Sequence, residues 1–290
     1  MSSIATSRTA RLRELLARPG IRLMPCCFDA LSARLIERAG FELTFMSGFG
    51  VSAARLGKPD TGLISYGEMC DQGRNICEGL TIPVIGDGDT GYGNALNVKR
   101  TVRGYAQVGF AGVMIEDQVA PKRCGHTEGK QVVERDEALA RLRAAVDARD
   151  EGADVVIVAR TDARATHGLD EALARGRAFA ELGADVVFIE ALADVDELRR
   201  VGRSIEKPLL ANMLEGGKTP ILPPKELESL GFKLAAYPVT LLNAAIVGMQ
   251  QALAELARGV PPHGLLDFPS LRKLVGFDAY DAEAARYASP

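Results

Sequence analysis

The sequence predicts an α/β fold, a (β/α)8 barrel with a C-terminal helical extension. Two observations predict it: short apolar runs alternate with amphipathic segments, and a glycine ends most amphipathic segments just before the next apolar run. The apolar runs are continuous, which is typical of parallel strands covered on both faces. Repeated strand–helix units are most economically arranged as a closed barrel. An open, doubly wound sheet is the alternative.

Eight apolar runs are the predicted strands. In chain order they are Ile21–Cys26, Leu43–Met46, Ile82–Ile85, Gly112–Ile115, Val155–Ala159, Val186–Ile189, Leu209–Ala211 and Leu234–Tyr237. The segments between them carry apolar side chains at helical spacing, as in 134–147 and 170–182. Gly109 and Gly183 follow such segments, where a left-handed residue commonly closes a helix.

We predict that residues 1–290 form a single barrel domain. Residues 1–20 are expected to contain a short amphipathic helix whose apolar side is formed by Leu12, Leu15 and Leu16. Residues 21–258 are expected to form the barrel, and residues 259–290 the helical extension. The last barrel helix, at about 241–257, is followed by a Pro-Pro-His-Gly break. The short helices beyond that break are suited to packing on a neighbouring subunit.

Composition excludes several classes of partner. With 290 residues, 47% of them hydrophobic, the chain is long enough to bury a sizeable core. The net charge of −3 comes from dispersed charges, which argues against nucleic acid, and no apolar run approaches the roughly 18 residues needed to span a membrane. The five cysteines match neither a disulfide framework nor a paired zinc motif, which favours the cytoplasm. We expect a small-molecule partner.

The most informative motif is GDGDTGYGN, at 86–94. Asp87 and Asp89 stand two residues apart after an apolar run, so on an extended backbone both side chains point the same way and can share one cation. Gly86 and Gly88 leave the backbone uncrowded for a hydrated Mg²⁺ or a small polar ligand. An isolated Asp-x-Asp is more often a turn, but the other strand ends favour a functional site.

Polar residues follow nearly every predicted strand, where barrel enzymes build their active sites. The residues at these strand ends are Ser47, Gly48, Asp87, Asp89, Glu116, Asp117, Arg160, Thr161, Asp162, Glu190, Asn212 and 238–240. For Arg160, a structural ion pair with Glu190 or Asp162 and capture of a substrate carboxylate are about equally supported. For Glu116 the two alternatives are a role near a metal and a salt bridge in the core. For Asn212 they are a role in the site and a hydrogen bond to loop backbone.

A second strong motif surrounds Cys124 in the long connection after the fourth predicted strand. Its neighbours Lys122, Arg123 and His126 form an electropositive setting of the kind that lowers a thiol pKa. Gly125 and Gly129 would let this segment move as a lid. We therefore interpret Cys124 as a chemical residue and His126 as an acid, base or hydrogen-bonding group. Packing residues are expected at Cys26, Cys27, Cys70 and Cys77.

Together these motifs resemble the isocitrate lyase and phosphoenolpyruvate mutase superfamily. The resemblance covers about residues 22–257 and rests, in family order, on SGFGVSAARLGKPD (47–60), GDGDTGYGN (86–94), IEDQ (115–118), KRCGH (122–126), VARTDA (158–163), FIEA (188–191) and LANMLEGGKTP (210–220). KRCGH is highly specific within this set. The chain is most similar to the branch of 2-methylisocitrate lyase, 2,3-dimethylmalate lyase and petal death protein. Carboxyphosphonoenolpyruvate mutase-like proteins share KRCGH, whereas phosphoenolpyruvate mutase proper lacks it.

The resemblance implies a role for individual residues. A Mg²⁺ site, which Mn²⁺ could also occupy, is implied at Asp60, Asp87, Asp89 and Glu116. The implied catalytic residues are Cys124, the acid, with Lys122, His126, Arg160 and Glu190. Substrate contacts are implied for Ser47, Gly48, Phe49, Asp87, Gly125, His126, Arg160, Glu190, Asn212 and Pro238. The family's usual assembly implies a homotetramer in which paired barrels exchange C-terminal helices.

The expected activity is Mg²⁺-dependent cleavage of a 2-hydroxy dicarboxylate of the 2-methylisocitrate, 2-alkylmalate or dimethylmalate type. The products would be an α-keto acid and a carboxylate, formed through an enolate that Cys124 protonates. The alternatives are a carboxyphosphonoenolpyruvate-type phosphonomutase, an oxaloacetate hydrolase or decarboxylase, and a barrel that only binds a metabolite. The partner is expected to be a di- or tricarboxylate, and its C2 and C3 substituents are left open.

Overall fold

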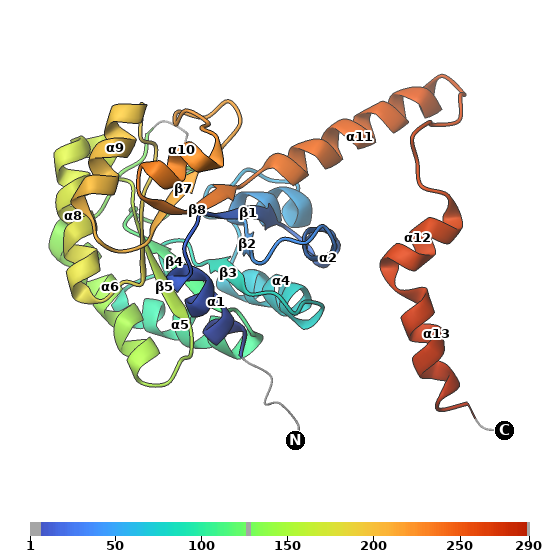
Figure 1. The fold of residues 1–290 in the computed structure, drawn as a ribbon, viewed down its shortest axis with the longest axis horizontal. Helices are drawn as coiled ribbons and strands as arrows, with labels where there is room; N and C mark the ends of the chain where they lie inside the picture. The colour runs from blue at the N-terminus through green and yellow to red at the C-terminus, as the bar shows by residue number, and fades with distance from the viewer. Residues whose placement is uncertain (1–6, 126–128, 289–290) are drawn as a thin grey trace. The chain divides into compact units, whose positions relative to one another are not determined.

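The computed structural model describes residues 7–125 and 129–288, and within them eight parallel strands close into a barrel in sequence order (Figure 1). The strands are β1 (Arg22–Cys27), β2 (Thr44–Met46), β3 (Val84–Asp87), β4 (Gly112–Glu116), β5 (Val156–Thr161), β6 (Val186–Ile189), β7 (Leu209–Asn212) and β8 (Phe232–Tyr237). Because β1 pairs with β8, the ring is closed. The predicted (β/α)8 barrel is confirmed and the open sheet is wrong.

Helices alternate with the strands, and further helices follow the last strand. They are α1 (Arg8–Ala17), α2 (Ala30–Arg38), α3 (Gly48–Val51), α4 (Tyr66–Glu78), α5 (Ala95–Val108), α6 (Arg135–Asp150), α7 (Ala163–His167), α8 (Leu169–Leu182), α9 (Val195–Ser204), α10 (Pro224–Ser229), α11 (Thr240–Ala257), α12 (Phe268–Val275) and α13 (Phe277–Ala285), with a π-helical turn η1 (Ser52–Leu56) after α3. Asn94 caps α5 through its side chain, and Gly109 and Gly183 end α5 and α8 at φ of 103° and 110°. The predicted glycine caps are thus present.

The core has two layers. One lies inside the barrel and includes Met114, Val158 and Phe188, and the other lies between the strands and the helices. Leu12 and Leu15 of α1 belong to the inner layer, so the predicted amphipathic helix packs against the barrel's inner core. The side chains of each strand alternate between the two layers.

This alternation places polar groups at the barrel's carboxyl end. In β5, Val156 and Val158 join the inner layer whereas Ile157 and Ala159 join the outer one, so Arg160 follows on the inward face. The same alternation brings Glu116 in after Met114. Several strands run further than the sequence predicts: Asp87, Glu116, Arg160 and Asn212 lie within their strands, not after them, because ladder pairing continues through them, as in the Glu116–Arg160 register.

The chain divides into two compact units, Met1–Leu242 and Asn243–Pro290. The first contains the barrel. The second contains the rest of α11 with α12 and α13, and many of its large apolar side chains are exposed. Assignment of the whole chain to one domain stays a prediction. Among the described residues, no helix combines the length and apolar character needed to cross a membrane.

Candidate active site

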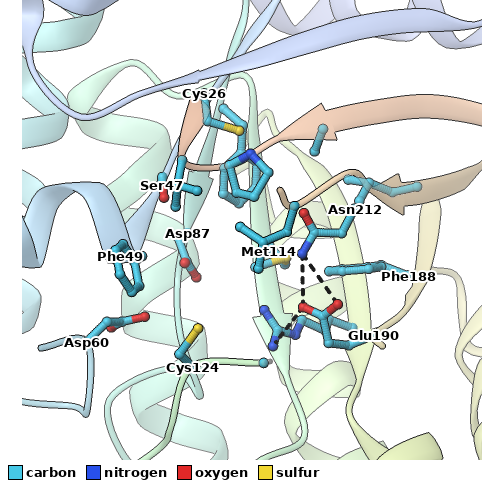
Figure 2. Close-up of a pocket in the computed structure, with 18 of the residues that line it drawn as sticks. Cys26, Ser47, Phe49, Asp60, Asp87, Met114, Cys124, Phe188, Glu190 and Asn212 are labelled. Atoms are coloured by element: carbon cyan, nitrogen blue, oxygen red, sulfur yellow. Dashed lines mark hydrogen bonds and ion pairs between the residues drawn. The ribbon is translucent and has the colours of Figure 1, made fainter. Parts of the chain in front are cut away.

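A cavity of about 140 Å³ opens at the carboxyl ends of the strands. Many of the residues predicted for the site line it: Ser47, Phe49, Asp60, Asp87, Lys122, Cys124, Gly125, Arg160, Glu190, Asn212 and Pro238. In the view of Figure 2, Asp60 and Asp87 lie to the left of the cavity and Glu190 and Asn212 to the right. Gly48, Asp89 and Glu116 adjoin these residues, and His126 lies outside the described residues.

The first polar group of the site is an acidic cluster around Lys122. The Lys122 Nζ atom lies 2.7 Å from Asp60 Oδ2 and 2.8 Å from Asp89 Oδ1, and all three side chains are buried. Burial raises the pKa of Asp89 to about 6, although the nearby Lys122 ammonium opposes the shift. Burial alone would lower the pKa of Lys122, but Asp89 and Asp60 outweigh it and raise that pKa well above its ordinary value. The Lys122 ammonium thus supplies positive charge within this buried group of carboxylates.

Asp87 is oriented by the backbone around it. Its two carboxylate oxygens accept the N–H groups of Gly48 at 3.2 Å and of Asp89 at 3.1 Å. The Tyr105 hydroxyl donates to the Asp87 carbonyl at 2.7 Å. A Cβ at Gly48 would lie 2.6 Å from Asp87 Oδ2, so a glycine is required beside this carboxylate. These contacts fix the end of β3 at the rim of the cavity.

The donor set fits a hard divalent cation such as Mg²⁺. Asp60 Oδ1 and Glu116 Oε1 are buried and accept no hydrogen bond from any residue that the structure describes. Within residues 7–125 and 129–288, no three acidic, histidine or cysteine side chains form a ready coordination sphere. Mg²⁺ is commonly bound by one or two carboxylates, with water and substrate oxygens completing its shell, so a full protein cage is not required.

Arg160 is the centre of the second polar group. Its Nε and Nη2 atoms lie 2.8 and 3.1 Å from the two carboxylate oxygens of Asp162. Nε is also 3.2 Å from Glu116 Oε2, and Nη2 is 3.2 Å from Glu190 Oε2. Burial disfavours the guanidinium charge, but these carboxylates outweigh it and raise the Arg160 pKa well above its ordinary value. The structural ion pairs expected for Arg160 are present, and the side chain also borders the cavity.

Glu190 and Asn212 form the right-hand wall in Figure 2. The Asn212 Nδ2 group donates to Glu190 Oε1 and Oε2 at 3.4 and 3.2 Å, so the amide contacts the site itself. The ring of Phe188 lies beneath the guanidinium, with Arg160 Cζ 5.3 Å from its centroid. This contact holds the arginine side chain against the inner core.

The segment that carries Cys124 lies directly on the ion pair between Arg160 and Glu190. A Cβ added to Gly125 would stand 2.4 Å from both Arg160 Nη2 and Glu190 Oε2, so only glycine fits there. The Cys124 side chain is half-buried and borders the cavity. The sequence predicts that Lys122 contributes positive charge around the Cys124 thiol. In the structure, the Lys122 ammonium is instead paired with the carboxylates of Asp60 and Asp89.

The comparisons with known proteins give the family. The model of the phosphoenolpyruvate phosphomutase family matches residues 12–257. The chain belongs to this family. The superfamily that the motifs resemble is thereby confirmed, and the chain is an enzyme of this group of lyases and mutases.

Curated members of the family include lyases and a mutase. The chain is 42% identical to the 2,3-dimethylmalate lyase of Eubacterium barkeri, over 97% of this chain and 98% of that protein. It is 39% identical to the 2-methylisocitrate lyase of Aeropyrum pernix, with 96% and 91% covered. It is also 41% identical to the chloroplastic carboxyvinyl-carboxyphosphonate phosphorylmutase of Arabidopsis thaliana, with 96% and 84% covered.

Solved structures of family members share the fold over nearly the whole chain. A crystal structure of 2,3-dimethylmalate lyase superposes with a TM-score of 0.93 at 37% identity, covering 98% of this chain and 96% of that one. A phosphonopyruvate hydrolase crystallised with oxalate and Mg²⁺ gives a TM-score of 0.85 at 28% identity, with 97% and 99% covered.

Sequence reasoning did not find the apolar half of the cavity. That half is formed by Cys26, Phe45, Met114, Phe188, Leu210, Leu214 and Ala236, together with Val239, which lies in the predicted strand-end segment 238–240. In the sequence these residues are ordinary strand or loop residues, and Cys26 was interpreted as packing only. The available signal was strand alternation: residues two positions before an inward polar group face the same interior, as Met114 precedes Glu116.

Proposed function

We propose that this enzyme is a Mg²⁺-dependent carbon–carbon lyase that cleaves a 2-hydroxy dicarboxylate into an α-keto acid and a second carboxylate. The observation that carries the proposal is the shared cavity of Asp87, Arg160 and Cys124. It combines carboxylates suited to a divalent cation, a guanidinium suited to a substrate carboxylate, and a thiol suited to proton delivery. The 42% sequence identity to 2,3-dimethylmalate lyase, over 97% of this chain, supports the same activity.

The metal-site carboxylates, Arg160 and Cys124 each have a proposed task. Asp60, Asp87, Asp89 and Glu116 would hold Mg²⁺ or Mn²⁺, directly or through water. When bound, the ion supplies Lewis acidity that lowers the cost of negative charge on substrate oxygens. Arg160 binds a substrate carboxylate, and the two hydrogen bonds from its guanidinium group to Asp162 orient it. The 2-hydroxyl proton passes to water, C2 becomes the keto carbon, and the electron pair of the broken C2–C3 bond leaves with the other fragment as an enolate. Cys124 then gives its thiol proton to the carbon of that enolate and regains a proton from water.

The apolar half of the cavity supports a substrate with an alkyl branch. Met114, Phe188 and Leu210 belong to the inner core that forms this part of the lining. Burying one methylene contributes about 0.8 kcal/mol, so kcat/KM should rise about fourfold for each methylene that the wall accommodates. Alkylmalates should therefore be better substrates than malate.

The decisive experiment screens the purified protein with Mg²⁺ against malate, 2-alkylmalates, dimethylmalate, 2-methylisocitrate, isocitrate and oxaloacetate, with product analysis. An α-keto acid and a carboxylate in equal amounts support the lyase. A phosphonate formed from a carboxyphosphonoenolpyruvate-type substrate would replace it with the second candidate, the mutase, which the Arabidopsis relative favours. Oxalate and acetate from oxaloacetate alone would indicate a hydrolase, and binding without turnover a metabolite-binding barrel.

We also propose that the protein is a cytoplasmic homotetramer built from helix-swapped dimers. Exposed apolar side chains on the second unit support an assembly: Ile246, Val247, Met249, Leu253, Leu256, Leu265, Leu266, Phe268, Phe277 and Tyr280. An apolar surface of this kind is typical of a protein–protein interface. The five cysteines are free thiols, as expected in a reducing compartment. Light scattering on the eluting protein tests the assembly, and a monomer at micromolar concentration would overturn it.

A further inference from the structure

Lys130 is a buried charged residue to which neither the motifs nor the proposed mechanism gives a task. It stands a few residues after Cys124, and its side chain is 2% exposed. Its Nζ atom lies 2.7 Å from Asp162 Oδ1 and also donates to the carbonyl oxygen of Gly125. A buried ammonium with specific acceptors is costly to build unless its contacts fix something.

The acceptors of Lys130 belong to two different parts of the site. Gly125 lies in the segment that carries the thiol, and Asp162 lies just after β5. The Asp162 carboxylate is fully buried and also binds the Arg160 guanidinium, with Oδ1 shared between Lys130 and Arg160 Nη2. One ammonium therefore joins the backbone beside the thiol to the carboxylate that orients the guanidinium.

Asp162 is itself fixed by the barrel. Its backbone N–H donates to Asp117 Oδ1 at 2.9 Å, and Asp117 Oδ2 accepts from Thr161 at 2.6 Å and from Arg175 at 3.0 Å. These groups are buried. Lys130 thus connects the Cys124 segment to a rigid polar network at the ends of β4 and β5.

We propose that Lys130 is a positioning residue that sets the distance between the Cys124 thiol and the Arg160 guanidinium. This inference rests on the proposed function, in which the guanidinium holds the substrate and the thiol delivers a proton. Removal of the ammonium leaves the bidentate Asp162–Arg160 contact in place but takes the donor from the Gly125 carbonyl. Substrate binding should then persist while proton delivery suffers.

The test compares Lys130→Met, which keeps much of the side chain's apolar length and loses its donors, with the wild type. We expect kcat to fall about 10- to 100-fold, as for a catalytic group misplaced by about 1 Å. KM should stay within about threefold, because the Arg160 contact is retained. Lys99→Met is the matched control: Lys99 pairs with Glu151 on the surface, and its loss should leave both constants unchanged.

A second measurement does not depend on turnover. Cys124 is half-buried whereas the other four cysteines are buried, so iodoacetamide should label Cys124 first, and peptide mass spectrometry measures its rate. In Lys130→Met this rate should rise about tenfold, the change expected when a hydrogen bond to a charged group is lost. Because no substrate is present, this result stands even if the lyase activity itself is absent.

The outcomes separate positioning from general stabilisation. A lower melting temperature with wild-type alkylation rate and wild-type kcat would overturn the proposal, because Lys130 would then only stabilise the fold. If Lys130→Met does not fold, Lys130→Gln decides, since its amide is shorter than the lysine side chain and carries no charge. Unchanged alkylation and kcat in that variant would also overturn the proposal, and a change in both supports it.

Discussion

Replacement of Gly125 by alanine tests the geometry of the site most directly. The added Cβ would stand 2.4 Å from Arg160 Nη2 and from Glu190 Oε2, about 1 Å short of an ordinary contact. Neither partner moves away easily, because Asp162 holds the guanidinium with two bonds and Asn212 donates to Glu190. The thiol segment and the ion pair must therefore separate by about 1 Å.

A displacement of this size has a definite kinetic cost. Misplacing a reacting group by about 1 Å lowers the rate about 100-fold, which corresponds to about 2.7 kcal/mol of transition-state stabilisation. We expect kcat/KM of Gly125→Ala to fall by about that factor. Thermal unfolding should change little, because the residue lies outside the strands and helices that build the core.

The assay is steady-state release of α-keto acid from the best alkylmalate in the presence of Mg²⁺. Gly67→Ala in α4 is the control, because a Cβ there meets nothing closer than Ser65 Oγ at 4.0 Å. That variant should keep its kinetics and gain a little stability from the better helix former. Wild-type kcat/KM in Gly125→Ala would refute the reasoning, since the segment could not then lie on the ion pair during turnover.

Three further substitutions test the proposed roles. Asp87→Ala should abolish Mg²⁺ binding in calorimetry and turnover while the fold persists, and full activity of the wild type in thoroughly chelated buffer would contradict the metal site. Arg160→Lys keeps the charge but loses the planar fork, so turnover should fall strongly; a lower melting temperature with normal kinetics would leave only the structural ion pairs. Cys124→Ser should lose about 10²- to 10⁴-fold in lyase turnover while Mg²⁺-dependent oxalate binding persists, and a near-normal rate would exclude the thiol as the acid.

Local periodicity explains what could be predicted of the site. Once β5 is recognised, alternation along the strand gives the inward direction of Arg160, and the barrel rule gives the end at which it lies. The extended backbone predicted for the Asp87 and Asp89 pair is wrong: β3 ends at Asp87, and Asp89 lies in the turn that follows with a left-handed φ of 47°. The residue types of the pair were recognisable from the sequence, but its geometry was not. The strand ends were less accurate, because ladder pairing with a neighbour, and not the residue's own hydropathy, extends β3, β4, β5 and β7 through polar residues.

Contacts between distant segments could not be predicted in this way. Lys122 lies in a basic motif, yet its ammonium contacts Asp60, a residue 62 positions away in the sequence. Glu190 was recognisable as a strand-end carboxylate, but its hydrogen bond to Asn212 forms only because β6 pairs with β7 in the barrel. Lys130 gave no signal at all, since a lysine after a glycine is most often a solvated surface residue.

The barrel, the inward face of each strand and the residue types at the rim follow from the amino-acid sequence, because hydropathy, glycine caps and side-chain alternation are properties of short segments. Which rim residues meet depends on the folded chain: closure of β1 on β8 brings the strand ends into one ring, and the loops then place Lys122 among carboxylates and Gly125 against Arg160. Burial and ion pairing act between groups close in space, and their closeness is fixed only after the whole barrel has closed.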